Sequence, residues 1–168
     1  STNVKIRISD AASNNQIYSM SPNVFTISRL FLISPNGGER WRAGSTKSIT
    51  WDRSSNINNV NLQYAIVPNP TESDWIDIIA STPASSGSYY WNIPEALSTV
   101  NAKIRIRFVS NTTIQDVSDN PFAIGYVQIS QPTGSNVWQA GKQYQISWNA
   151  SSSVSNVKIE YSTNAGGT

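Results

Sequence analysis

Carboxylates are the residues of this chain that could do chemistry, because histidine and cysteine are both absent. Without histidine, the commonest general base and the commonest transition-metal ligand are missing. Without cysteine, there are no thiolate nucleophiles, disulfides or thiolate-bound metals. The 10 Asp and Glu side chains are therefore the first candidates for a catalytic or metal site.

A pair of carboxylates about 5–10 Å apart could hydrolyse a glycosidic bond. The candidates for such a pair are Glu39, Glu72, Asp74, Asp77 and Glu95. Their spacing singles out no two of them, and a small β domain rarely carries the cleft that this reaction needs. We therefore expect that the chain is not an enzyme and that it binds no cofactor.

Asp116 and Asp119 could bind calcium, which favours several oxygen ligands in one loop. A related segment, residues 17–23, has Tyr18 near the position of Asp116 and lacks both carboxylates. A metal that the fold required would be needed in both segments. We expect capping and turn hydrogen bonds for these carboxylates, and no metal site.

Aromatic residues are the candidates for a binding surface. Trp75, Tyr89, Tyr90 and Trp91 are more than one core requires. Alternation along a strand places Tyr89 and Trp91 on one face and Tyr90 on the other. We take Trp75, Tyr89 and Tyr90 as candidate surface-contact residues that stack on sugars or contact another unit or chain. Packing within the domain is the alternative.

The composition is typical of a neutral, polar-surfaced protein. Of the 168 residues, 38% are hydrophobic and 13% are charged, and the net charge is +2. The basic residues are scattered, so the sequence predicts no nucleic-acid binding. No apolar run reaches the length of a membrane span, so we expect no membrane insertion. A cysteine-free, Ser/Thr/Asn-rich chain suits an extracellular or cell-surface location.

Short β-strands are the elements that position these residues. Alternating or β-branched runs occur at 30–34, 46–52, 59–66, 75–80, 88–93, 102–108 and 122–127. Turn residues separate them, and no segment has a sustained helical period. This spacing predicts an all-β, immunoglobulin-like or fibronectin-III-like sandwich with very little helix.

The same alternation assigns the core, with Trp51 at its centre. The residues expected to face inward are Trp41, Ile49, Trp51, Leu62, Tyr64, Trp91, Ile104, Ile106 and Phe122. Lys103, Arg105 and Arg107 alternate with two of these isoleucines. We therefore expect the three basic residues to form an exposed stripe.

The sequence repeats itself about every 97 residues. Residues 129–141 match 33–44 after one inserted residue, with Ile129 aligned on Ile33, and Trp148 follows Trp51 by 97 positions. Residues 3–8 match 101–106, and residues 21–27 match 118–124. Because separate blocks of sequence repeat with nearly the same period, the chain is predicted to consist of tandem structural units.

This period predicts one complete sandwich flanked by two partial ones. Residues 1–28 are the C-terminal strands of a preceding repeat, 29–124 are a complete repeat, and 125–168 are the N-terminal strands of a following repeat. We interpret the chain as a portion of a longer protein. One or two residues separate the units, which is too short for a flexible tether. Successive units should therefore form a stiff rod.

The motifs within residues 33–44, 49–51, 89–94, 103–107 and 116–124 resemble immunoglobulin-like repeats of bacterial secreted and surface proteins. Those repeats are similar to the N-terminal domain of the yeast Ser/Thr-rich, GPI-anchored cell-wall family linked to β-glucan assembly. The resemblance implies the fold and a mostly non-catalytic role. It implies no binding site that can be placed on individual residues.

We interpret the chain as a non-catalytic structural repeat of an extracellular protein that forms a stiff stalk, fibre or filament, with adhesion as a further role. The alternative is a carbohydrate-binding or cell-wall-binding module that accompanies a secreted enzyme. Expected partners are neighbouring repeats of the same or an identical chain, through strand complementation or end-to-end packing. Cell-wall polysaccharide is a second candidate partner.

Overall fold

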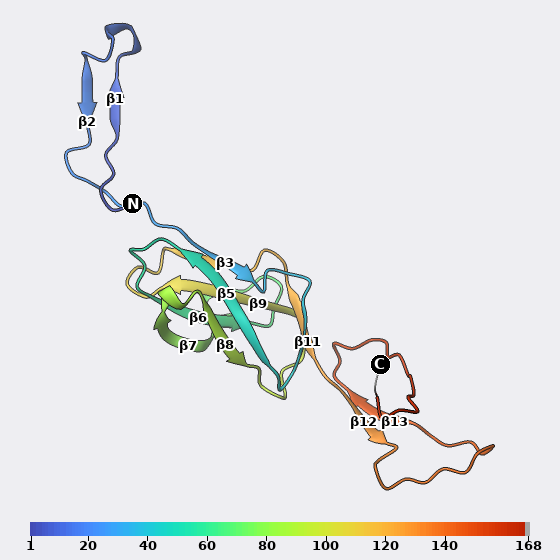
Figure 1. The fold of residues 1–168 in the computed structure, drawn as a ribbon. Coiled ribbons are helices and arrows are strands. Elements are labelled where there is room, and N and C mark those ends of the chain that lie inside the picture. Colours follow the sequence, from blue (N-terminus) through green and yellow to red (C-terminus); the bar gives the residue numbers. More distant parts are fainter. Residues whose placement is uncertain (167–168) are drawn as a thin grey trace.

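The computed structural model describes residues 1–166, which are all-β apart from three single-turn 3-10 helices (Figure 1). The strands are β1 Arg7–Ser9, β2 Tyr18–Met20, β3 Leu30–Ser34, β4 Arg40–Arg42, β5 Thr46–Arg53, β6 Asn59–Ala65, β7 Ile76–Pro83, β8 Ser88–Asn92, β9 Thr99–Phe108, β10 Gln115–Val117, β11 Phe122–Gly125, β12 Val127–Gln131 and β13 Ser147–Ala150. The 3-10 turns are η1 Ala11–Ser13, η2 Glu72–Asp74 and η3 Ala84–Ser86. The prediction of an all-β chain is confirmed. Within the described residues, no helix has the length and apolar character needed to cross a membrane.

Strands β3 to β11 form a two-sheet sandwich. One sheet has the order β3-β5-β8, and the other has the order β4-β11-β9-β6-β7 with β10 paired to β9. All pairs are antiparallel except β4 with β11, which are parallel. The sequence pattern did not predict β4 and β10, because three residues are too few to show an alternation.

The core lies between the two sheets, and all nine residues expected there lie in or against it. Seven of them are at most 5% exposed, and Trp41 and Tyr64 are partly buried against the cluster. Trp51 is 3% exposed, and its indole N–H donates to the Ala84 carbonyl at 2.9 Å. The buried polar edge of Trp51 is therefore satisfied within the sandwich.

The predicted exposed stripe of basic residues is wrong at Arg105, which is only 3% exposed. Its guanidinium donates to the Glu72 carboxylate at 2.6 Å and to the Gln63 side-chain oxygen at 2.6 and 2.9 Å. The guanidinium also lies 4.5 Å from the centre of the Trp75 ring. The segment that carries Glu72 and Trp75 thus covers a face of the sheet that alternation alone assigned to solvent.

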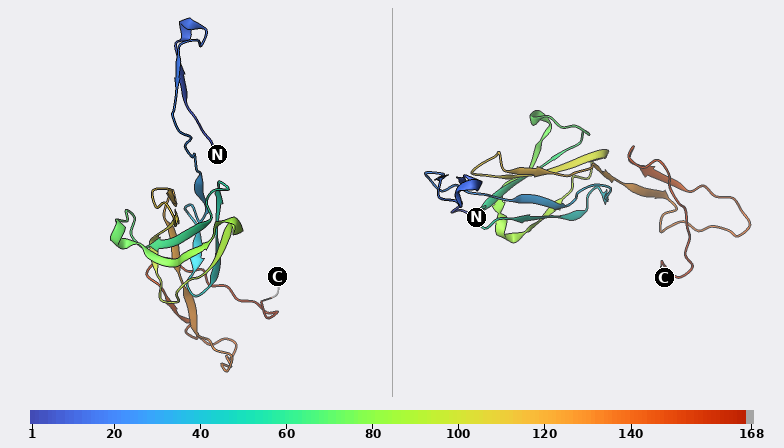
Figure 2. Two further views of the ribbon diagram at one scale, coloured as in Figure 1. Left: turned by 90° about the vertical axis from the view of Figure 1, so that its left-hand side faces the viewer. Right: turned by 90° about the horizontal axis from the view of Figure 1, so that it is seen from above.

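The sandwich lies between two projecting hairpins. The β1–β2 hairpin extends from one end and the β12–β13 strands from the opposite end (Figure 1), and the two views in Figure 2 show the same order of the three parts. Both hairpins expose apolar side chains, including Ile8 and Ile129 at 74% and 64%. Because the three parts lie in a row, the molecule is elongated.

The pairing of β12 with β13 reproduces that of β3 with β5. Ile129 pairs with Trp148 as Leu32 pairs with Trp51, and every pair in one hairpin differs from its counterpart by 97 positions. The irregularity in register recurs at the same place. The sequence alignment of Ile129 with Ile33 was therefore wrong by one residue, because a shared Ile-Ser pair outweighed the strand register.

The pairing of β1 with β2 likewise reproduces that of β9 with β10. The three residue pairs coincide after a shift of 98 positions in one strand and 97 in the other. The bridge between Val4 and Phe25 matches the pair formed by Ala102 and Phe122. Both flanking segments therefore pair their strands as the central sandwich does.

Candidate functional site

Four of the five carboxylates considered for catalysis are held by neighbouring groups, namely Glu39, Glu72, Asp74 and Asp77, and the fifth, Glu95, lines a groove that is described below. Glu39 accepts the backbone N–H groups of Asn36 and Gly37 at 2.9 and 2.8 Å and so closes a turn. Asp74 accepts the Thr71 backbone N–H at 2.7 Å and its hydroxyl at 2.6 Å. These hydrogen bonds lower the pKa of Asp74, with the side-chain bond as the larger cause.

Asp77 and Glu72 bind the polar outer face of the six-stranded sheet. Asp77 accepts the side-chain amides of Asn61 and Gln63 at 2.8 and 3.0 Å. The Glu72 carboxylate accepts a hydrogen bond from the Arg107 guanidinium at 2.7 Å, in addition to the one from Arg105. Hydrogen bonds from Arg105 and then Arg107 lower the pKa of Glu72 from 4.5 to about 2. Glu72 thus fastens its loop to the sheet, and its lowered pKa is the opposite of the raised pKa that a general acid needs.

The two carboxylates considered for calcium also bond within the protein. Asp116 accepts the Leu32 backbone N–H at 2.7 Å and links β10 to β3. Asp119 accepts the Asn36 side-chain amide at 2.8 Å. Ser19 occupies the register position of Asp116 in the β1–β2 hairpin, although the sequence suggested Tyr18. Over residues 1–166, no three or more acidic side chains gather as a metal site would require.

The three candidate aromatic residues lie in different environments. Trp75 is partly buried and stacks under the Arg105 guanidinium, and Tyr89 packs against the core. Tyr90 is 72% exposed on the outer face of β8, where it pairs with Ser48 of β5. Of the three, Tyr90 alone presents an open ring to solvent.

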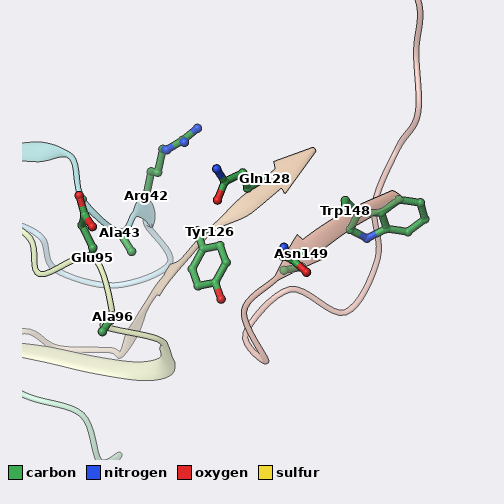
Figure 3. Close-up of a pocket in the computed structure, with 10 residues that line it drawn as sticks. Arg42, Ala43, Glu95, Ala96, Tyr126, Gln128, Trp148 and Asn149 are labelled. Atoms are coloured by element: carbon green, nitrogen blue, oxygen red, sulfur yellow. The ribbon is translucent and has the colours of Figure 1, made fainter. Parts of the chain in front are cut away.

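A groove lies between the sandwich and the β12–β13 strands (Figure 3). Its volume is about 820 Å³, within the range of small-ligand sites. Arg42 and Glu95 line the side of the sandwich, Asn149 lines the opposite side, and the Tyr126 ring lies between them. The Trp148 side chain points away from the groove. Sequence reasoning missed this site because it considered each unit by itself.

The comparison with family models identifies one match. The model described as the Kre9/KNH-like N-terminal Ig-like domain matches residues 34–123, which is more than half of the chain. The matched residues run from the end of β3 to β11 and thus cover most of the sandwich. Neither the curated proteins nor the solved structures compared with the chain contain a match.

Proposed function

Since the chain belongs to the family of Kre9/KNH-like N-terminal Ig-like domains, we propose that it is a non-catalytic structural repeat of a secreted, cell-wall-associated protein. The family is secreted and associated with the cell wall, which supports an extracellular or cell-surface location. Within that setting, the repeat forms part of a stiff stalk, fibre or filament. Adhesion is a role that such a stalk would serve.

The shared strand register carries this proposal. The β12–β13 strands repeat the pairing of β3–β5 residue for residue, and the β1–β2 hairpin repeats that of β9–β10. A segment that pairs its strands as an Ig-like unit does is best explained as part of such a unit. The partners of each unit are thus its neighbours in a tandem array, in the same or an identical chain.

The short junctions support a rod and not a flexible string. Tyr126 is the one residue between β11 and β12. A flexible linker has a reach that grows with the square root of its length, and a single residue provides almost none. The three parts of the chain lie in a row, as a rod of successive units requires.

Electron microscopy of the intact protein isolated from its source cells tests the proposal. We expect thin rods whose length increases with the number of units, in the cell-wall fraction. Incubation with β-glucans should release no reducing ends. Compact particles, or hydrolysis of a glucan, would contradict a non-catalytic stalk.

Carbohydrate binding is the second candidate function, and the open ring of Tyr90 and the junction groove with Tyr126 favour it. Aromatic rings stack on the apolar faces of sugars. If either ring binds sugar, the amount of protein retained in a pull-down on insoluble β-glucan or chitin should fall for the corresponding variant, Tyr90→Ala or Tyr126→Ala. Tyr161→Ala is the matched control, since Tyr161 is 92% exposed outside the groove. Equal retention of all variants, or no retention of any, would exclude these two rings as binding residues.

A further inference from the structure

Two loops, which we call the junction loops, have the same structure in the two units. They are residues 54–57 after β5 and residues 151–154 after β13, and they lie 97 positions apart. In the first loop, the Ile57 N–H donates to the Ser54 carbonyl at 3.1 Å. In the second loop, the Val154 N–H donates to the Ser151 carbonyl at 3.0 Å. The sequence similarity of the units thus extends to a turn outside the strands.

The first serine of each junction loop holds the linker by two hydrogen bonds. Ser54 accepts the Arg29 N–H through its hydroxyl at 2.8 Å and donates its own N–H to the Arg29 carbonyl at 2.8 Å. Ser151 makes both bonds to Tyr126, each at 3.0 Å. Arg29 and Tyr126 are also 97 positions apart. The first residues of each following unit, Arg29 and Tyr126, are therefore held to their own junction loop through both the N–H and the C=O.

The third residue of each loop reaches the end of the preceding unit. The Asn56 side-chain amide donates to the Ser28 hydroxyl at 2.6 Å. The Ser153 hydroxyl donates to the Ile124 carbonyl at 2.9 Å and lies 3.4 Å from the hydroxyl of Ser98. These side chains differ, but both connect the loop of one unit to the last strand or loop of the unit before it.

Packing at the second junction leaves little room for movement. Ser151 is 6% exposed, so its hydroxyl bond to the linker is shielded from water. A Cβ atom added at Gly125 would overlap the hydroxyls of Ser151 and Ser153. Gly125 is the last residue of β11, and its lack of a side chain lets the loop close on the backbone. A buried and fully bonded polar contact has one preferred geometry.

We propose that the junction loops are the interface between successive units and that each one locks the following unit onto its predecessor in a fixed orientation. The inference rests on the proposed function, because a locked junction has a mechanical role only in an array. The partner of each loop is the C-terminal end of the preceding copy of the unit, which is Ser28 at the first junction and β11 at the second. The serine bonds occupy equivalent positions at both junctions, whereas Ser28 stands in the first junction where Gly125 stands in the second, so the two steps share these bonds but not every contact.

Hydrogen exchange of two amides in the full chain tests the lock. Ser151→Ala should speed exchange of the Tyr126 amide by at least about fivefold, the factor expected for one hydrogen bond of ordinary net strength, and leave the Arg29 amide unchanged. Ser54→Ala should do the reverse. Ser152→Ala is the matched control, since Ser152 is exposed in the same loop. An unchanged Tyr126 amide in Ser151→Ala would overturn the lock.

Distance measurements between spin labels test the orientation. The chain has no cysteine, so Ser19→Cys in the hairpin and Ser85→Cys in the sandwich give a labelled pair at two exposed sites. We expect one narrow distance distribution, which broadens when Ser54 and Asn56 are both replaced by alanine. A broad distribution in the parent chain, or no broadening in the double variant, would overturn the proposal. Circular dichroism confirms that each variant retains its strands.

The failure of the lock and the failure of the proposed function give different results. If electron microscopy shows rods but the serine variants have no effect, the structural role stands and the lock is refuted. Compact particles together with the expected amide and distance changes would leave the lock and remove the stalk.

Discussion

Replacement of Trp51 provides the sharpest test of the sandwich. The side chain is 3% exposed, so Trp51→Ala removes nearly all of a large buried surface and leaves a cavity. We expect a loss of about 3–5 kcal/mol in the free energy of unfolding. Trp51→Phe keeps most of the packing but loses the N–H bond to the Ala84 carbonyl. That carbonyl also accepts the Gly87 N–H at 3.3 Å, so the second variant should lose only about 1–2 kcal/mol.

Trp148 is the matched control for Trp51. It has the same register position in the β12–β13 strands but is 40% exposed. Trp148→Ala should therefore cost about 1 kcal/mol or less. Urea unfolding followed by far-ultraviolet circular dichroism suits these measurements, since six tryptophans would complicate fluorescence. Similar losses for the two alanine variants would refute the assignment of Trp51 to a closed core.

Four further predictions concern other parts of the structure, and thermal melting checks each. The hydrogen bonds from Arg105 lower the pKa of Glu72 from 4.5 to about 2. The contribution of the ionised Glu72 to stability is therefore fully present above pH 4.5 and is lost as the pH falls towards 2. The difference in Tm between the parent and Glu72→Gln should disappear over the same range of pH. Ser118→Ala should lose about 1–3 kcal/mol, because a hydroxyl that bonds two backbone groups is only 1% exposed. Gly125→Ala should lose about 1–3 kcal/mol through overlap with the junction loop, and wild-type stability would argue against the close contact. Tyr90→Ala should change stability by less than about 0.5 kcal/mol, and a larger loss would mean that the ring packs on something.

The sandwich could be predicted because its core residues alternate with polar ones. In β5, the apolar Ile49 and Trp51 alternate with the polar Ser48 and Thr50, and this pattern identifies the face that points into the core. Strands β3 and β5 begin at the predicted residues, since turn residues mark their ends. Local periodicity is thus sufficient wherever one face of a strand meets the core and the other meets water.

The same reasoning failed where a third layer covers a face. Arg105 alternates with Ile104 and was assigned to solvent, but the loop that carries Glu72 and Trp75 folds over it. Alternation distinguishes the two faces of a strand and contains no information about a loop 30 to 33 positions away. The bonds of Ser151 to Tyr126 were missed for a similar reason, since serine in a polar sequence carries no signal of its own.

The parallel pairing of β4 with β11 determines how the sandwich would respond to a pull along the array. Tension enters through the residues before β3 and leaves through those after β11, so the two parallel strands are drawn in opposite directions along their length. Their three residue pairs, from Ala123 with Arg40 to Gly125 with Arg42, then resist together as a sheared patch and do not open one at a time. A stalk built from such units would bear load at every repeat before any of them unravels.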